Sequence, residues 1–149
     1  MAHGEMSRRE NRQVAVAAAT LGPWRTAAGV GALVGATDLV IDLIDGDWSL
    51  SMLAGPAGLA LFFFFLVGTV GGRLRRDTAD RRLHKWANEH PWQAALPAAG
   101  GLLLLNTLAQ LFLGDAGVFE AFFLSLFPAA MVLGVAGVVG SVKRARSKD

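Results

Sequence analysis

The chain has 149 residues, of which 53% are hydrophobic and only 17% charged, and its mean hydropathy is +0.43. A soluble domain normally carries about 25% charged residues, so this composition argues against a soluble globular protein. The net charge is only +2, and no cysteine is present. The absence of cysteine excludes disulfides, thiolate catalysis and cysteine metal sites.

A polar, basic segment at 1–23 precedes four apolar stretches, at 24–44, 48–72, 92–113 and 117–142. Each stretch holds about 20 residues or more, which at a rise of 1.5 Å per residue is enough to cross a ~30 Å hydrocarbon core. In lipid every backbone polar group must be satisfied internally, so these spans are helices. The sequence therefore predicts an all-α integral membrane protein with one transmembrane domain at 24–142.

Lys and Arg residues are confined to alternate connections of the predicted spans. All fourteen lie at or before the start of the first span, between the second and third, or after the fourth, whereas Asp45–Trp48 and Gly114–Ala116 contain none. This positive-inside pattern predicts that both termini, the loop 73–91 and the basic tail 143–149 lie in the cytoplasm. We expect a multi-pass protein of the cell (inner) membrane, with its four spans arranged as two helical hairpins in a compact bundle.

The bases of the loop between the second and third spans suggest contact with lipid. Each basic residue near an anionic membrane surface contributes about 1 kcal/mol of attraction. We expect anionic headgroups on the cytoplasmic side, rather than nucleic acid, to be the partner of this face. A purely solvated loop that only sets the topology is an equally good interpretation. The candidate headgroup-binding residues are Arg73, Arg75, Arg76, Arg81, Arg82 and Lys85.

Small residues recur at four-residue spacing within the spans, which allows helices to approach closely. They serve either packing within the bundle, which is the more common use of such motifs, or an interface with a second copy or a membrane-protein partner. The candidate packing residues are Gly31, Gly35, Gly68, Gly72, Gly134 and Gly137.

Proline occurs in three of the predicted spans, as Pro56, Pro97 and Pro128. A proline inside a helix has no N–H to donate, and so it frees the carbonyl four residues earlier. Membrane helices tolerate this where neighbouring groups satisfy the carbonyl. We expect ordinary kinks at the three positions.

Polar side chains at membrane depth are the most informative residues for function. Asp38 and Asp42 are four residues apart, so both carboxylates lie on one helix face. Asn106 and Gln110 have the same spacing in the third span, and Glu120 lies in the outer half of the fourth. If these faces turn inward, the five side chains form one cluster in the outer leaflet.

A charged side chain at the centre of a membrane helix costs about 2.5–3.5 kcal/mol, so we expect Asp38 to be protonated or partnered at neutral pH. The acidic pair has three functional interpretations: a proton or cation site in a coupled carrier, a site for a cationic ligand or hard metal, or a contact with another subunit. The alternative is structural. In that case Asp42 and Glu120 lie near the headgroups, and Asp38 bonds to Asn106 or Gln110.

No nucleophile elbow, phosphate loop or His-Glu-x-x-His metal motif is present, so the sequence predicts no catalytic residues, no metal and no cofactor. The small size and small-residue faces favour a non-enzymatic accessory, assembly or regulatory subunit that packs against membrane partners. The alternative is a small oligomeric proton- or cation-coupled carrier or channel using Asp38 and Asp42. A lipid-modifying enzyme would have to rely on the same acids, with Glu120, and has the least support.

Overall fold

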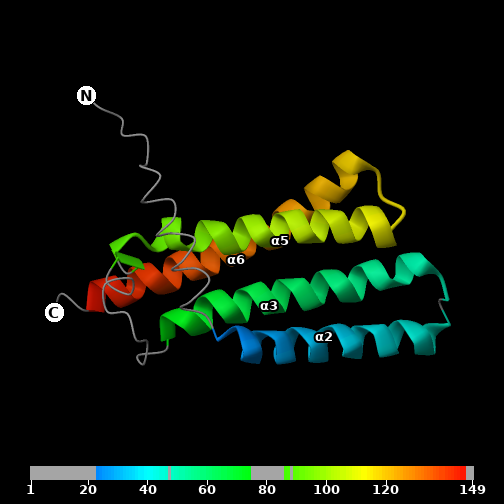
Figure 1. The fold of residues 1–149 in the computed structure, drawn as a ribbon, viewed down its shortest axis with the longest axis horizontal. Coiled ribbons are helices and arrows are strands. Elements are labelled where there is room, and N and C mark those ends of the chain that lie inside the picture. Colours follow the sequence, from blue (N-terminus) through cyan, green and yellow to red (C-terminus); the bar gives the residue numbers. More distant parts are fainter. Residues whose placement is uncertain (1–22, 47, 75–85, 88, 147–149) are drawn as a thin grey trace.

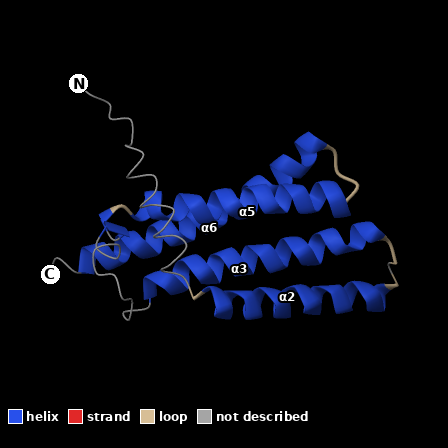
Figure 2. Cartoon of the chain, in the orientation of Figure 1, coloured by secondary structure: helices blue, strands red, loops and turns tan. Residues whose placement is uncertain are grey.

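The computed structural model describes residues 23–46, 48–74, 86–87 and 89–146. Most of the described residues are helical, and they include no strand (Figure 2). The predicted all-helical fold is confirmed. The elements in chain order are α2 (Trp24–Asp45), the 3₁₀ turn η1 (Leu50–Leu53), α3 (Ala54–Leu74), α5 (Pro91–Leu113) and α6 (Val118–Arg146).

The helices lie roughly along one axis in two neighbouring pairs (Figure 1). α2 packs along α3, and α5 packs along α6. α3 also contacts α5 and α6 and so joins the two pairs, whereas α2 has few or no contacts with α5 or α6. α2 is therefore an edge helix.

Local signals in the sequence set the ends of the helices. α2 stops at Gly46, whose φ of 86° lies in the left-handed region that favours glycine. The Gly46 N–H donates to the carbonyls of Asp42 and Leu43, which closes the last turn. At the other end of the bundle Pro91 is the first residue of α5, where its missing N–H costs nothing.

Pro56 does not interrupt a span, contrary to our expectation from the sequence. The chain first forms the 3₁₀ turn η1, and α3 begins at Ala54, so Pro56 falls in the first helical turn. The N–H groups of a first turn have no partner within the helix, so proline removes nothing there. Pro97 and Pro128 do lie inside α5 and α6.

α6 extends beyond the predicted end of the fourth span at 142 and continues to Arg146. Lys and Arg have good helix propensity. Positive charge is also favourable at the carboxyl end of a helix, where the macrodipole is negative. The basic tail therefore begins as the last turn of α6 rather than as a separate segment.

The core is formed where α3, α5 and α6 meet. Its centre comprises Phe65, Ala98, Leu102 and Val132. Trp24, the first residue of α2, packs against this centre with ring centroids 5.2 Å from Phe64 and 6.3 Å from Phe65.

Candidate functional site

Asp38 and Asp42 are both half-buried on α2, in the half of the helix that leads to η1. The Oδ2 atom of Asp38 lies 3.7 Å from the position that a Cβ would take on Gly55 of α3. Within the described part of the chain, neither carboxylate makes a hydrogen bond or an ion pair. Asp38 therefore lies at the α2–α3 contact without a polar or charged partner among the described residues.

Asn106 belongs to α5 and is buried at the contact with α6. Its Nδ2 donates a hydrogen bond of 3.0 Å to Oγ of Ser125, and Ser125 donates one of 2.7 Å to the carbonyl of Ala121. Asn106 Oδ1 is buried without a hydrogen-bond partner. It lies 2.9 Å from the position that a Cβ would take on Gly58 of α3.

Asn106 Oδ1 is an unpaired acceptor at its approach to Gly58. Leaving a buried acceptor unsatisfied costs about 1–3 kcal/mol. Because Gly58 has a hydrogen where other residues have Cβ, the α3 backbone can approach Asn106 Oδ1 closely. Any larger residue at position 58 would collide with the amide.

Gln110 follows Asn106 by one turn and approaches the same part of α3. Its Nε2 lies 3.9 Å from the Cβ position of Gly58, and its Oε1 lies 3.1 Å from that of Gly114. The Gly114 N–H donates to the Gln110 carbonyl at 3.0 Å and ends α5. The two amides thus share one face of α5, as their spacing predicts.

The expected outer cluster therefore forms only in part. Asp38 reaches Gly55 from α2, and Asn106 and Gln110 reach Gly58 from α5, so the three side chains approach one end of α3 from two helices. No hydrogen bond between described residues joins Asp38 to either amide. Instead, Asn106 is bonded to Ser125 of α6.

Glu120 is exposed in the first turn of α6. A carboxylate is favourable there because the amino end of a helix carries a partial positive charge. In the described ranges, no three His, Asp or Glu side chains are placed to hold a metal ion together. Glu120 near the headgroups therefore stays a prediction.

Sequence reasoning missed Gly55 and Gly58, although the polar side chains of α2 and α5 meet α3 at these two residues. The available signal was the pair of glycines around Pro56 in an otherwise bulky apolar span. Such a pair can mark a place where another helix approaches the backbone closely.

The candidate packing glycines differ in what they contact. A Cβ on Gly31 would lie 2.5 Å from the Ala60 carbonyl oxygen, and one on Gly35 would lie 2.8 Å from the Pro56 carbonyl oxygen, so both permit close contact between α2 and α3. Trp24 covers Gly68, and Trp92 covers Gly137. Gly72 is buried, but a Cβ on Gly134 would meet nothing within 4 Å.

Most of the candidate headgroup-binding residues fall outside the described part of the chain. Arg73 belongs to the last turn of α3. The other five, Arg75, Arg76, Arg81, Arg82 and Lys85, lie outside the described residues.

The pattern of burial in this bundle is the reverse of that in a soluble protein, because small residues are buried and large apolar residues are exposed. Most of the buried hydrophobic residues are alanines, whereas large side chains such as Leu33, Phe112 and Phe119 are 70–82% exposed. Only 17–28% of the most apolar stretch of each span is buried within the chain. A contiguous apolar surface of this kind is unfavourable in water and favourable in lipid.

The fold and its surface together define the class of the protein. In the described part of the chain, four helices are long and apolar enough to cross a membrane, which is the make-up of a multi-pass membrane protein. Comparison with protein-family models, with curated proteins and with solved structures gives no match.

Proposed function

We propose that this chain is a non-enzymatic accessory, assembly or regulatory subunit of the cell (inner) membrane that acts by packing its spans against a membrane partner. The observation that carries this proposal is the position of α2 at the edge of the bundle. Among the described helices α2 packs along α3 alone, which leaves its opposite face available for another protein.

The outward face of α2 suits a close helix–helix contact. Gly31 and Gly35 are used on the face toward α3, whereas Ala28, Ala32 and Ala36 are exposed at four-residue spacing. Small residues in this arrangement let the backbone of a partner helix approach closely, and association in lipid depends on such packing. The partner is either a span of another membrane protein or a second copy of this chain.

The proposed topology has two helical hairpins with both termini in the cytoplasm. α2 begins, α3 ends, α5 begins and α6 ends at one end of the bundle (Figure 1). Arg25, Lys143 and Arg144 belong to this end, whereas Asp42, Asp45 and Asp115 belong to the other. The position of these three bases at one end matches the positive-inside rule.

The topology can be tested with single cysteines because the chain has none of its own. In intact cells we expect a membrane-impermeant maleimide to label Ser49→Cys from outside and Ala145→Cys only after permeabilisation. Both positions are exposed, so differences in burial do not explain a difference in labelling. Labelling of Ala145→Cys in intact cells would refute the proposed orientation.

The partner proposal is tested by affinity purification of the tagged protein in a gentle detergent, followed by mass spectrometry and native mass measurement. We expect a stoichiometric second membrane protein or a defined homo-oligomer. Ala32→Phe should release it, whereas Ala130→Phe, the same change at an exposed alanine of α6, should retain it. A monomer without a partner, or equal loss with both variants, would contradict the proposal.

The alternative function is an oligomeric proton- or cation-coupled carrier or channel. Two observations favour it: Asp38 is half-buried at membrane depth with no partner among the described residues, and Asn106 Oδ1 is a buried acceptor without a hydrogen bond at the same end of α3. Ionisable groups inside a membrane domain commonly mark ion or proton pathways.

The alternative is tested by flux in proteoliposomes. Asp38→Asn should abolish proton or cation flux and leave the fold intact, whereas Asp45→Asn, at the exposed end of the same helix, should leave flux unchanged. Flux that survives Asp38→Asn would eliminate this function. That result would leave the accessory role untouched, because the purification test is independent of Asp38.

A further inference from the structure

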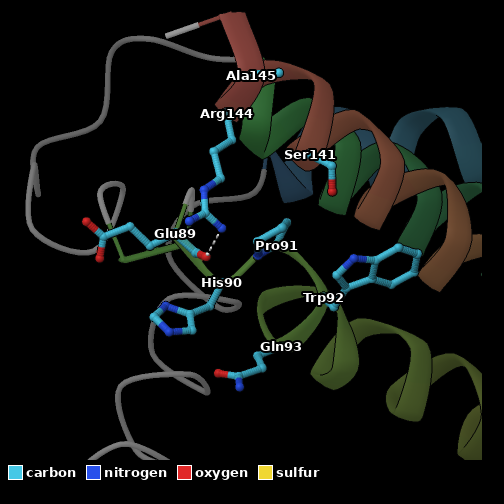
Figure 3. A pocket seen from close by; sticks show the side chains of 8 residues that line it. All are labelled: Glu89, His90, Pro91, Trp92, Gln93, Ser141, Arg144 and Ala145. Atoms are coloured by element: carbon cyan, nitrogen blue, oxygen red, sulfur yellow. Dashed lines mark hydrogen bonds between the residues drawn. The ribbon is translucent and has the colours of Figure 1, made fainter. Parts of the chain in front are cut away.

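A cavity of about 560 Å³ lies at the end of the bundle where α5 begins and α6 ends. Figure 3 shows Pro91, Trp92 and Gln93 of α5 on one side and Ser141, Arg144 and Ala145 of α6 on the other. Its volume is in the range of sites that hold small molecules or headgroups. Asp38, Asp42 and the exposed face of α2 do not line this cavity.

Arg144 is the main positive group of this cavity. Its Nη1 donates a hydrogen bond of 3.1 Å to the backbone carbonyl of Glu89, which holds the guanidinium beside the residues that precede α5 (Figure 3). A guanidinium presents five N–H donors in a fixed fork, a geometry that matches the oxygens of a phosphate group.

The other charged and polar side chains among the described residues that line the cavity are compatible with an anion. The carboxylate of Glu89 points away from the Arg144 guanidinium, although its backbone carbonyl is bonded to it (Figure 3). The ring of His90 stacks on Trp86 with centroids 5.4 Å apart, and its side chain does not cap α5. The amino end of the 23-residue helix α5 adds a partial positive charge to the contribution of Arg144.

The surroundings of the cavity favour a lipid over a soluble phosphate compound. Trp92, which is 49% exposed, packs its ring on Gly137 and is the type of residue that lies at headgroup level. One turn deeper, Leu96 on α5 and Val138 on α6 are 51% and 55% exposed. A headgroup in the cavity would therefore have apolar surface beneath it along which its acyl chains could lie.

We propose that this cavity between the start of α5 and the end of α6 binds the phosphate group of an anionic phospholipid, with Arg144 as the principal ligand. The site is separate from the loop bases that the sequence suggested for general headgroup contact. It does not depend on the accessory role, because it requires only that this end of the bundle lies at a membrane surface.

The test uses the full chain purified in a neutral detergent and titrated with phosphatidylglycerol or with phosphatidylcholine of the same acyl chains. Native mass spectrometry measures the lipid-bound fraction. We expect selective retention of phosphatidylglycerol, weakened roughly tenfold by Arg144→Gln, the scale of one charge-assisted hydrogen bond. Arg144→Lys keeps the charge but loses the fork and should give an intermediate loss.

The matched control is Arg25→Gln, which removes one exposed arginine at the same end of the bundle but outside the cavity. It should leave lipid retention unchanged, and circular dichroism should show the same helix content for all variants. Equal retention of both lipids, unchanged binding by Arg144→Gln, or an equal loss with Arg25→Gln would overturn the proposal. If sn-glycerol 3-phosphate competes for the site as well as phosphatidylglycerol does, the bound phosphate group is not specifically that of a lipid.

Discussion

The side-chain amide of Asn106 on α5 is hydrogen-bonded to the hydroxyl of Ser125 on α6, at 3.0 Å. Both residues are almost completely buried. In lipid neither water nor a hydrophobic driving force is available to hold helices together, so a polar contact of this kind fixes the rotation of one span against the other. The most buried polar side chains of the described bundle thus join two helices rather than line an acidic site.

Ser125→Ala tests this contact. The variant removes the acceptor of the Asn106 amide, and we expect it to lower the free energy of unfolding by about 1 kcal/mol, the scale of interhelical hydrogen bonds in membranes. The measurement is unfolding by SDS in mixed micelles. Thr107→Val is the control, because among the described residues the Thr107 hydroxyl bonds to the Leu103 carbonyl of its own helix and to no other helix. An equal effect of the two variants would contradict an interhelical role for Ser125.

Gly31→Ala tests the close contact between α2 and α3. The new Cβ would lie 2.5 Å from the Ala60 carbonyl oxygen, so the helices must separate. We expect a destabilisation of about 1–3 kcal/mol, as for overpacking of a core. Gly29→Ala is the matched control two residues earlier, since a Cβ there meets nothing within 4 Å. If the same unfolding assay gives equal stability for both variants, the α2–α3 packing described here is wrong.

Gly137→Ala tests the packing of Trp92 on α6. The added Cβ would lie 2.5 Å from Cε3 of the Trp92 ring, so the indole must move. In protein labelled with fluorotryptophan we expect the Trp92 resonance, assigned by its loss in Trp92→Phe, to shift. Gly134→Ala, three residues earlier and in open space, should leave the resonance in place. An unshifted signal in Gly137→Ala would show that the ring does not lie on Gly137.

The three prolines should differ in their effect when replaced. Pro56→Ala should change the stability by less than about 1 kcal/mol, because a first-turn proline removes no hydrogen bond. Pro128→Ala lets residue 128 donate to the Leu124 carbonyl and should remove the kink that a proline inside α6 is expected to cause.

Electron–electron distances between spin labels on cysteines at positions 112 and 119, both exposed where α5 ends and α6 begins, report the shape of α6. We expect this distance to change in Pro128→Ala and to stay constant in Pro56→Ala. A constant distance in both variants would mean that Pro128 does not shape the helix.

The four spans could be predicted because length and hydropathy alone decide whether a segment can cross a membrane. The predicted stretch 24–44 and the helix Trp24–Asp45 nearly coincide, and 92–113 is matched by Pro91–Leu113. The differences occur where local chemistry decides, as at η1 and Pro56, where a 3₁₀ turn precedes the helix. Hydropathy does not distinguish such a turn from the helix that follows it.

Less of the candidate site than of the fold could be predicted from the sequence. The i, i+4 spacing correctly placed Asn106 and Gln110 on one face of α5, but it did not show that Asn106 would bond to Ser125 rather than to Asp38. Spacing along one helix defines which residues share a face. It contains no information about which neighbouring helix that face meets.

The sequence by itself determined the class of this protein, four apolar helices with their bases gathered on alternate connections, because these properties belong to each segment separately. Only the tertiary structure decided that Gly31 and Gly35 face α3, that Gly134 faces open space, and that Arg144 meets the start of α5 in a cavity. In water a helix shows its inner face by an apolar stripe. In lipid both faces of a helix are apolar, so the sequence pattern does not distinguish them. The packing of neighbouring helices then decides which face turns inward.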